Sequence, residues 1–191
     1  MKYIKIDTIN STNDFLKAYL KESFLDNFFY VYTDYQTKGR GQRSNTWQSE
    51  CCKNILISIF IKPPWELSHQ AILNRIISLG IIKFLEKFNI SNLKIKHPND
   101  IMAGEKKIAG ILIENLIHNK QWKNSVVGIG LNINQTNFVN LPEATSMKLI
   151  TGQDYNVEEM VHQLVNQIKI QYFRDAESLN KDFNKYLHPE A

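Results

Sequence analysis

The chain has 191 residues, of which 43% are hydrophobic and 22% are charged, and its formal net charge is +4 at pH 7. These values are typical of a soluble globular domain with a substantial core, and no apolar run approaches the roughly 18–20 residues of a membrane-spanning helix. The only cysteines are the adjacent Cys51 and Cys52, and the five histidines show no metal-ligand spacing, so neither a disulfide framework nor a zinc site is indicated.

The N-terminal segment predicts a strand, a helix and a second strand. Residues 3–7 alternate as a strand does and lack the apolar core of a signal peptide, so the expected compartment is the cytoplasm. Ser11 is a suitable N-cap for a helix that ends near Lys21. Residues 28–33 are rich in aromatic and β-branched side chains and are predicted to form a strand.

A long polar loop follows, and then a buried strand and a helix. Residues 36–50 contain two glycines and show neither helical nor strand periodicity, so they are predicted to form a loop. Loops of this length in compact domains are often functional. Residues 54–61 form a strongly apolar predicted strand, which ends before Pro63. Residues 68–88 show helical periodicity. The predicted buried stripe of this helix consists of Ile72, Ile76, Leu79 and Phe84.

The remaining elements predict hairpins and then C-terminal helices. Residues 93–96 form a short strand, and residues 101–113 read as a hairpin that turns at 103–105. The strand that begins at Lys107 continues to about His118, with residues 125–133 as its antiparallel partner. Residues 157–187 are predicted to contain one or two helices. Their inward-facing residues are predicted to be Met160, Leu164, Ile168 and Phe173.

These elements predict the α+β class, with a mixed, largely antiparallel sheet flanked by helices. We find no repeats and no low-complexity linker, so a single domain over residues 1–191 is expected.

Two clusters of cations and glycines point to an anion site. One is Gly39-Arg40-Gly41-Gln42-Arg43, and the other joins residues 96–100 (KHPND) to residues 107–112 (KIAGIL). The sequence shows no Ser/His/Asp order typical of a catalytic triad and no metal-ligand set beside these clusters. Residues 1–150 carry a net charge of +7 and residues 151–191 carry −3, which fits an anionic ligand, although an ordinary solvated surface explains the charge alone equally well. A nucleotide-using transferase or ligase is the leading hypothesis, and no DNA-reading pattern is present.

A series of motifs in the same order resembles the catalytic core of bacterial biotin–protein ligases, over about residues 1–150. The motifs are Ser11-Thr12-Asn13, Tyr35-Gln36, Gly39-Arg40-Gly41 with Trp47, residues 96–100, residues 107–112, residues 128–134 (GIGLNIN) and Thr145-Ser146. Each motif alone is weak, and their order and spacing together carry the resemblance.

The resemblance implies a class II synthetase-like domain of the biotin–lipoate ligase type. It implies an ATP-dependent, AMP-forming ligase with Mg²⁺ as cofactor. Biotin would attack the α-phosphate of ATP, and biotinoyl-AMP would then acylate a lysine of a biotin carboxyl carrier protein. Such catalysis consists mostly of positioning and charge stabilisation. No nucleic-acid or membrane partner is expected, and a homodimer stays open.

The resemblance also implies roles for individual residues. Lys107 corresponds to the catalytic cation between the biotin carboxylate and the α-phosphate, Arg40 to a phosphate-binding residue, and Asp100 to a residue that orients the site or binds Mg²⁺. The implied biotin-binding residues are Ser11, Thr12, Asn13, Gln36, Gly39, Arg40, Gly41, Lys107, Gly110, Leu112, Gly128 and Gly130. The implied ATP-binding residues are Arg40, Arg43, Trp47, Lys96, Asn99, Lys107 and Asn132. Each also has an ordinary explanation, such as a helix cap, a surface loop, a packed tryptophan or a solvated lysine.

The chain departs from the family pattern at several positions. Gln42 stands where many members have arginine and Ser44 where many have glycine, so we expect weaker retention of biotinoyl-AMP. His97 replaces the commoner tryptophan, which we interpret as a packing change. A DNA-binding module before residue 1 is not expected. The SH3-like C-terminal domain of the family is expected to be absent or truncated after Ala191.

Two alternatives remain. A lipoate–protein ligase or octanoyltransferase shares the fold, but would carry an RRxSGGG-like stretch where this chain has GRGQRS. A non-catalytic biotin-binding module would bind biotin without forming biotinoyl-AMP.

Overall fold

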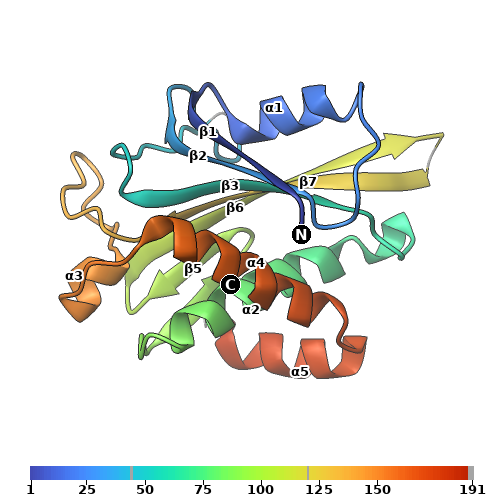
Figure 1. The fold of residues 1–191 in the computed structure, drawn as a ribbon. Coiled ribbons are helices and arrows are strands. Elements are labelled where there is room, and N and C mark those ends of the chain that lie inside the picture. The colour runs from blue at the N-terminus through green and yellow to red at the C-terminus, as the bar shows by residue number, and fades with distance from the viewer. Residues whose placement is uncertain (44, 120, 189–191) are drawn as a thin grey trace.

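The computed structural model describes residues 1–43, 45–119 and 121–188 (Figure 1). Ser44 therefore lies outside the described residues. Seven strands form one sheet in the order β1-β2-β3-β7-β6-β5-β4. β1 and β2 run parallel, whereas the other neighbouring pairs are antiparallel. The strands are β1 (Tyr3–Ile9), β2 (Tyr30–Gln36), β3 (Asn54–Ile61), β4 (Leu93–Lys96), β5 (Asp100–Ala103), β6 (Lys106–His118) and β7 (Gln121–Asn132).

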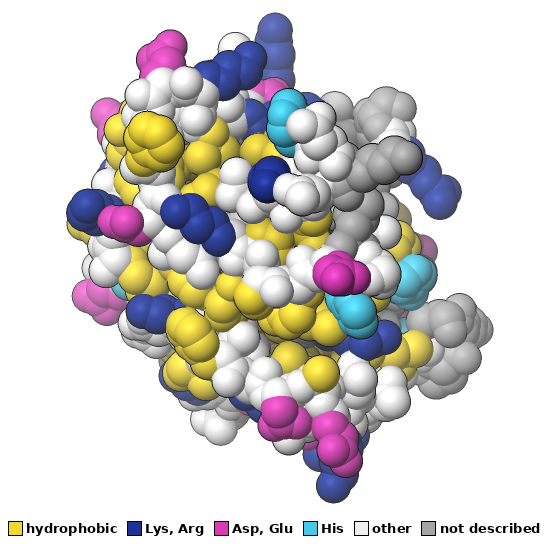
Figure 2. Space-filling model, turned by 90° about the vertical axis from the view of Figure 1, so that its right-hand side faces the viewer, with side chains coloured by type: hydrophobic (Ala, Val, Ile, Leu, Met, Phe, Trp, Pro, Cys, Tyr) yellow, Lys and Arg dark blue, Asp and Glu magenta, His cyan; other side chains and the backbone are white. Residues whose placement is uncertain are grey.

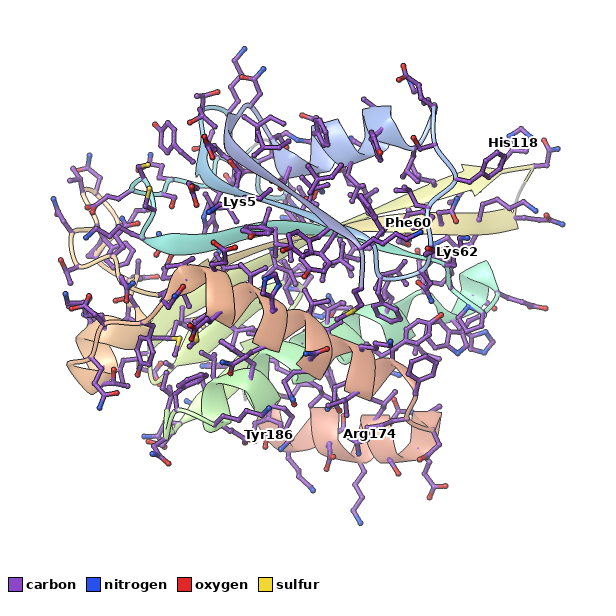
Figure 3. All side chains as sticks on the ribbon, viewed as in Figure 1. Lys5, Phe60, Lys62, His118, Arg174 and Tyr186 are labelled. Atoms are coloured by element: carbon purple, nitrogen blue, oxygen red, sulfur yellow. The ribbon has the colours of Figure 1, made fainter. Side chains whose placement is uncertain are left out.

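Helices cover both faces of the sheet, so the predicted α+β class is confirmed. The helices are α1 (Thr12–Tyr19), α2 (Ala71–Glu86), α3 (Met147–Thr151), α4 (Val157–Tyr172) and α5 (Ala176–Tyr186), with a 3₁₀ turn at Leu67–His69. α1 lies on one face, and α2, α4 and α5 lie on the other (Figure 1). The larger hydrophobic core fills the layer between the sheet and these three helices (Figure 3). A smaller core lies under α1 and includes Leu16, Val31 and Phe60.

Most predicted elements appear near their expected bounds. Ser11 is the N-cap of α1, and its hydroxyl accepts a hydrogen bond from the Asp14 N–H. The predicted helix over 68–88 forms α2, which is buried nearly all round because it is packed between the sheet and two further helices. α3 was not predicted, since five residues carry too little periodicity.

One predicted core residue is wrong. Phe173 is 71% exposed, whereas Met160, Leu164 and Ile168 are buried as expected. The reason is that Phe173 stands five residues after Ile168, which is out of step with the helical period, and Gln171 and Tyr172 continue the buried face instead. Figure 2 shows that, on one face of the molecule, hydrophobic side chains are visible among polar and charged ones. Within the described part of the chain, no helix is both long enough and apolar enough to cross a membrane.

The β4–β5–β6 segment sets the geometry of the site. Gly104 adopts a φ of 61° in the turn between β5 and β6, a conformation that glycine accepts without steric cost. Asp100 pairs with Gly110 in the ladder, and a bulge follows between Ile101 and Met102. Such bulges redirect side chains, and here Asp100 and Lys107 come into contact.

Candidate active site

Two adjoining cavities lie beside the loop that joins β2 and β3. The first has a volume of about 240 Å³ and is walled by the N-terminus of α1, the loop, β6 and β7. The second has a volume of about 390 Å³ and lies between the ends of β4 and β5 and residues 138–144. Four residues border both cavities: Thr46, Trp47, Asp100 and Lys107. The boundary between the cavities is therefore built around one cation, one carboxylate and one aromatic ring.

The first cavity brings together nearly all of the residues predicted to contact biotin. They are Ser11, Thr12, Asn13, Gln36, Arg40, Gly41, Lys107, Gly110, Leu112, Gly128 and Gly130. Gly39 differs, because it is buried and packs against the loop itself. A Cβ added there would lie 2.5 Å from the carbonyl oxygen of Trp47, so Gly39 allows the two arms of the loop to approach.

A polar network fixes the N-terminus of α1 against the strands. Gln36 Oε1 accepts hydrogen bonds from the backbone N–H of Thr12 at 2.8 Å and from its hydroxyl at 3.1 Å. The hydroxyl of Ser58 contacts Thr12 Oγ1 at 2.7 Å and also contacts Asn13 Oδ1. The sequence analysis missed Ser58. A polar residue within the wholly buried strand β3 was the available signal.

The space beside the glycines of β6 and β7 is occupied largely by protein side chains. A Cβ on Gly128 would lie 2.5 Å from Asn13 Oδ1, and one on Gly130 would overlap the Trp47 ring. A Cβ on Gly110 would lie 2.9 Å from the same ring. Small residues on these strands thus seat Asn13 and Trp47, whereas the resemblance implies that Gly128 and Gly130 contact biotin.

Lys107 lies where the two cavities meet. Its Nζ is 2.7 Å from Asp100 Oδ1 and 5.6 Å from the centroid of the Trp47 ring. The Lys107 N–H donates to the carbonyl of Glu143, which joins the start of β6 to residues 141–146. The ammonium group is thus held in place, and an anion in either cavity can reach it.

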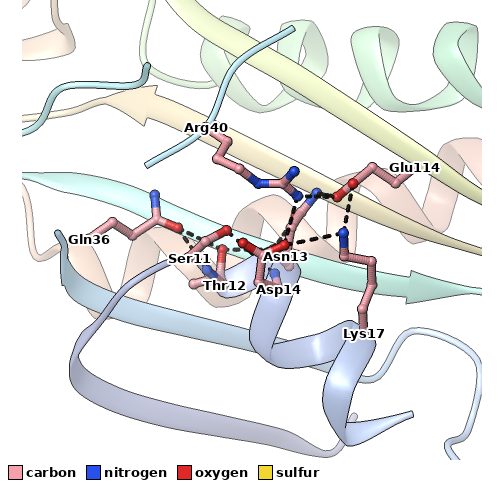
Figure 4. A network of polar contacts seen from close by, with 9 residues as sticks. Ser11, Thr12, Asn13, Asp14, Lys17, Gln36, Arg40 and Glu114 are labelled. Carbon is pink, nitrogen blue, oxygen red and sulfur yellow. Dashed lines mark hydrogen bonds and ion pairs between the residues drawn. The ribbon is translucent and has the colours of Figure 1, made fainter. Parts of the chain in front are cut away.

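Arg40, which the sequence predicts to bind phosphate, is paired with two carboxylates. It borders the first cavity but not the second. Its Nη2 lies 2.7 Å from Glu114 Oε2 and 2.9 Å from Asp14 Oδ1, as Figure 4 shows. These carboxylates neutralise the guanidinium and draw it toward α1 and β6. Glu114 was also missed by the sequence analysis, although it follows Gly110 and Leu112 at strand spacing and so shares their face.

The second cavity contains only part of the predicted ATP-binding set. Trp47, Lys96, Lys107 and Asn132 line it, whereas Arg43 and Asn99 line the first cavity. Asn132 donates to the carbonyl of Thr145 at 2.9 Å. Its Oδ1 is buried and has no hydrogen-bond partner among the described residues, so it can accept a hydrogen bond from a ligand.

Among the described residues, no group of three or more His, Cys, Asp or Glu side chains is arranged to hold a metal ion. Asp100 alone could supply one carboxylate oxygen to a cation that arrives with phosphate groups, which is the usual way that proteins hold Mg²⁺ with nucleotides.

Comparison with known proteins identifies one family. The model of the biotin/lipoate A/B protein ligase family matches residues 6–132. The bifunctional ligase/repressor BirA of Bacillus subtilis is 31% identical over 105 residues, 55% of this chain and 32% of that protein. BirA of Escherichia coli is 30% identical over 132 residues, 67% of this chain and 39% of that protein. The matched region is thus about a third of the length of these relatives.

Solved structures share the fold. A biotin protein ligase from Aquifex aeolicus in complex with biotin and ATP has a TM-score of 0.82 and 25% identity, and the match covers 97% of this chain and 78% of that chain. A biotin protein ligase from Leishmania major in complex with biotin has a TM-score of 0.79 at 21% identity, covering 100% and 82% of the two chains. At 21% identity the second likeness shows the fold alone.

Proposed function

Because this chain belongs to the biotin/lipoate A/B protein ligase family, we propose that it is a biotin–protein ligase. It activates biotin with ATP to biotinoyl-5′-AMP and then transfers biotin to a lysine of a biotin carboxyl carrier protein. The observation that carries the proposal is the position of Lys107, whose ammonium group borders both cavities. A reaction between two anionic substrates needs a cation at such a boundary.

Biotin occupies the first cavity in this proposal. The polar end of its wall is formed by Thr12, Asn13 and Gln36, which the network at the N-terminus of α1 holds in place. Donors and acceptors already fixed by the protein lose little entropy when a ligand binds. The biotin carboxylate then points toward Lys107, at the junction with the second cavity.

ATP occupies the second cavity. The buried Asn132 Oδ1 accepts a hydrogen bond from the nucleotide, and Trp47 offers an aromatic surface at the entrance. Lys96 contributes positive charge, and Lys107 stabilises the charge that develops on the α-phosphate as the biotin oxygen attacks and pyrophosphate leaves. Mg²⁺ bound by the phosphates, with Asp100 as a protein ligand, would neutralise further negative charge.

In the second step the acceptor amine attacks the acyl carbon of biotinoyl-AMP, an amide forms and AMP leaves. The first cavity holds the acyl group and the protein needs no covalent intermediate, which agrees with the lack of a catalytic triad among the predicted site residues. We propose residues 1–191 as one catalytic domain that acts in the cytoplasm, without a nucleic-acid partner.

Biotin-dependent exchange of labelled pyrophosphate into ATP, with Mg²⁺ present, tests the first step. We expect exchange in the natural chain and its loss in Lys107→Ala. Lys106→Ala is the matched control, because Lys106 is the exposed neighbour on the same strand and strand alternation directs it to the other face. Tight biotin binding without exchange would favour the non-catalytic binding module. Absence of both would disprove the proposal.

A further inference from the structure

One carboxylate of β6 binds both α1 and the loop after β2 at the edge of the first cavity. Glu114 of β6 accepts hydrogen bonds from Asn13 Nδ2 at 2.7 Å, Lys17 Nζ at 2.8 Å and Arg40 Nη2 at 2.7 Å. Figure 4 shows these donors converging from α1 and from the loop. The reaction proposed above assigns no role to Glu114.

The surroundings of Glu114 favour its ionised form. Burial by itself raises the pKa of this carboxyl, but the hydrogen bonds from its three donors outweigh burial and hold the pKa below its ordinary value. The side chain is 24% exposed, against 39% for Arg40. A charged acceptor that is partly shielded from water makes stronger hydrogen bonds than a fully solvated one.

Two of the three donors belong to the wall of the first cavity. Asn13 is held on one side by Glu114 and on the other by Ser58, above the space left by Gly128. Arg40 is the donor from the loop, and it lies in the wall of the first cavity but not of the second. Loss of the carboxylate would therefore leave Asn13 with Ser58 alone and Arg40 with Asp14 alone, so one wall residue on the helix and one on the loop would each lose one of two anchors.

We infer that Glu114 is a positioning residue that fixes Asn13 and Arg40 around the ligand of the first cavity. Arg40 then serves to fasten the loop to β6, and not to bind the phosphates of the nucleotide. The inference rests on the proposed function in that it takes this ligand to be biotin. It implies that Glu114 affects the affinity for biotin and leaves the affinity for ATP unchanged.

Limited trypsin digestion tests the fastening of the loop without any ligand. Cleavage is followed at the exposed Lys38 and Arg43, because Arg40 is itself a trypsin site that Arg40→Gln removes. We expect cleavage at these sites to be about tenfold faster in Glu114→Gln, because charge-assisted hydrogen bonds hold the closed loop. Glu22→Gln removes the same charge from an exposed glutamate and serves as the control. Cleavage of Glu114→Gln at the natural rate would overturn the inference.

A double-mutant cycle tests whether Glu114 acts through Arg40. We expect Arg40→Gln and Glu114→Gln each to raise the Kd for biotin, and the KM for biotin, by about tenfold. In the Arg40→Gln background, Glu114→Gln is expected to raise the Kd for biotin by less than tenfold, because only its effect through Asn13 remains. Full additivity of the two changes, or an equal rise in the KM for ATP, would overturn the inference.

The digestion and the double-mutant cycle together distinguish failure of this inference from failure of the proposed function. If the natural chain binds no biotin, the proposed function fails, while the digestion still decides whether Glu114 fastens the loop. The thermal midpoint of every variant is measured alongside. If Glu114→Gln loses global stability, Arg40→Gln replaces it in the digestion, and natural cleavage at Lys38 and Arg43 in that variant would overturn the inference.

Discussion

Carboxylates hold two of the site cations, Lys107 and Arg40, in position. Lys107 pairs with Asp100, and Arg40 pairs with Glu114 and Asp14. These pairs are partly exposed, and such pairs contribute only about 0–1 kcal/mol each. The pair with Asp100 can therefore orient Lys107 before the ligand arrives and still yield it at little cost when an anionic ligand binds.

Gln42 stands where the resemblance described in the sequence analysis leads us to expect an arginine. It lines the first cavity but carries no charge. A charge-assisted hydrogen bond is worth about 1.5–3 kcal/mol, so we expect Gln42→Arg to release biotinoyl-AMP at least about tenfold more slowly. Single-turnover release of labelled intermediate measures the rate. Equal off-rates for the two proteins would contradict the prediction.

The ionisation of Glu114 makes stability depend on pH. Its folded-state pKa is lowered, below the ordinary value of about 4.3. The stabilisation is thus complete above that ordinary value and is lost as the pH falls through the lower folded-state pKa. Urea unfolding at a series of pH values should show a constant difference between the natural chain and Glu114→Gln at neutral pH, and a shrinking difference as the pH falls below the ordinary value. A difference that stays constant, or that Glu22→Gln reproduces, would refute this assignment.

At the scale of elements, the contact between α2 and α4 depends on a glycine. A Cβ on Gly80 would lie 2.6 Å from Ile168 Cγ1 and 2.9 Å from Ile168 Cα. The second atom is backbone, so a rotamer change cannot relieve the overlap and the helices must move apart.

We therefore expect Gly80→Ala to destabilise the fold. Overpacking costs about 1–3 kcal/mol, whereas alanine gains about 1 kcal/mol of helix propensity over glycine, so strain outweighs propensity. The free energy of unfolding in urea measures the result. Asn166→Ala, on the exposed side of α4, changes propensity without the overlap and should be neutral or slightly stabilising. A Gly80→Ala protein as stable as the natural chain would show that the helices separate freely.

The elements differ in how well the sequence predicts them, and the reason is physical. The strand over 54–61 was predicted with its observed bounds because most of its residues are apolar and it lies inside the sheet. The motifs for the first cavity were also identified correctly as neighbours in space. The partners of Arg40 were not, because Glu114 lies 74 residues away and no local signal links the two. Phe173 was misassigned because it stands five residues after Ile168, out of step with the helical period of the buried face.

At the scale of the whole molecule, the site exists only when distant segments have assembled. The walls of the first cavity come from α1, the loop after β2, β6 and β7, which belong to opposite ends of the matched region. The fold class and the family resemblance predicted from the motifs are confirmed, yet the division of residues between two cavities emerges only from the assembled sheet.

This assembly predicts that the first-cavity ligand stabilises the entire fold. Biotin has no binding site on an unfolded chain whose wall residues are far apart, so binding shifts the unfolding equilibrium by mass action. At a free biotin concentration 100-fold above its Kd, we expect about 2.7 kcal/mol of added stability. Thermal or urea unfolding with and without biotin measures it, and lipoate at the same concentration is the control. Because the loop reads GRGQRS and lacks the RRxSGGG-like stretch of the lipoate branch, lipoate is expected to leave the midpoint unchanged. Stabilisation by lipoate and not by biotin would reassign the first cavity, and the chain, to the lipoate branch of the same family.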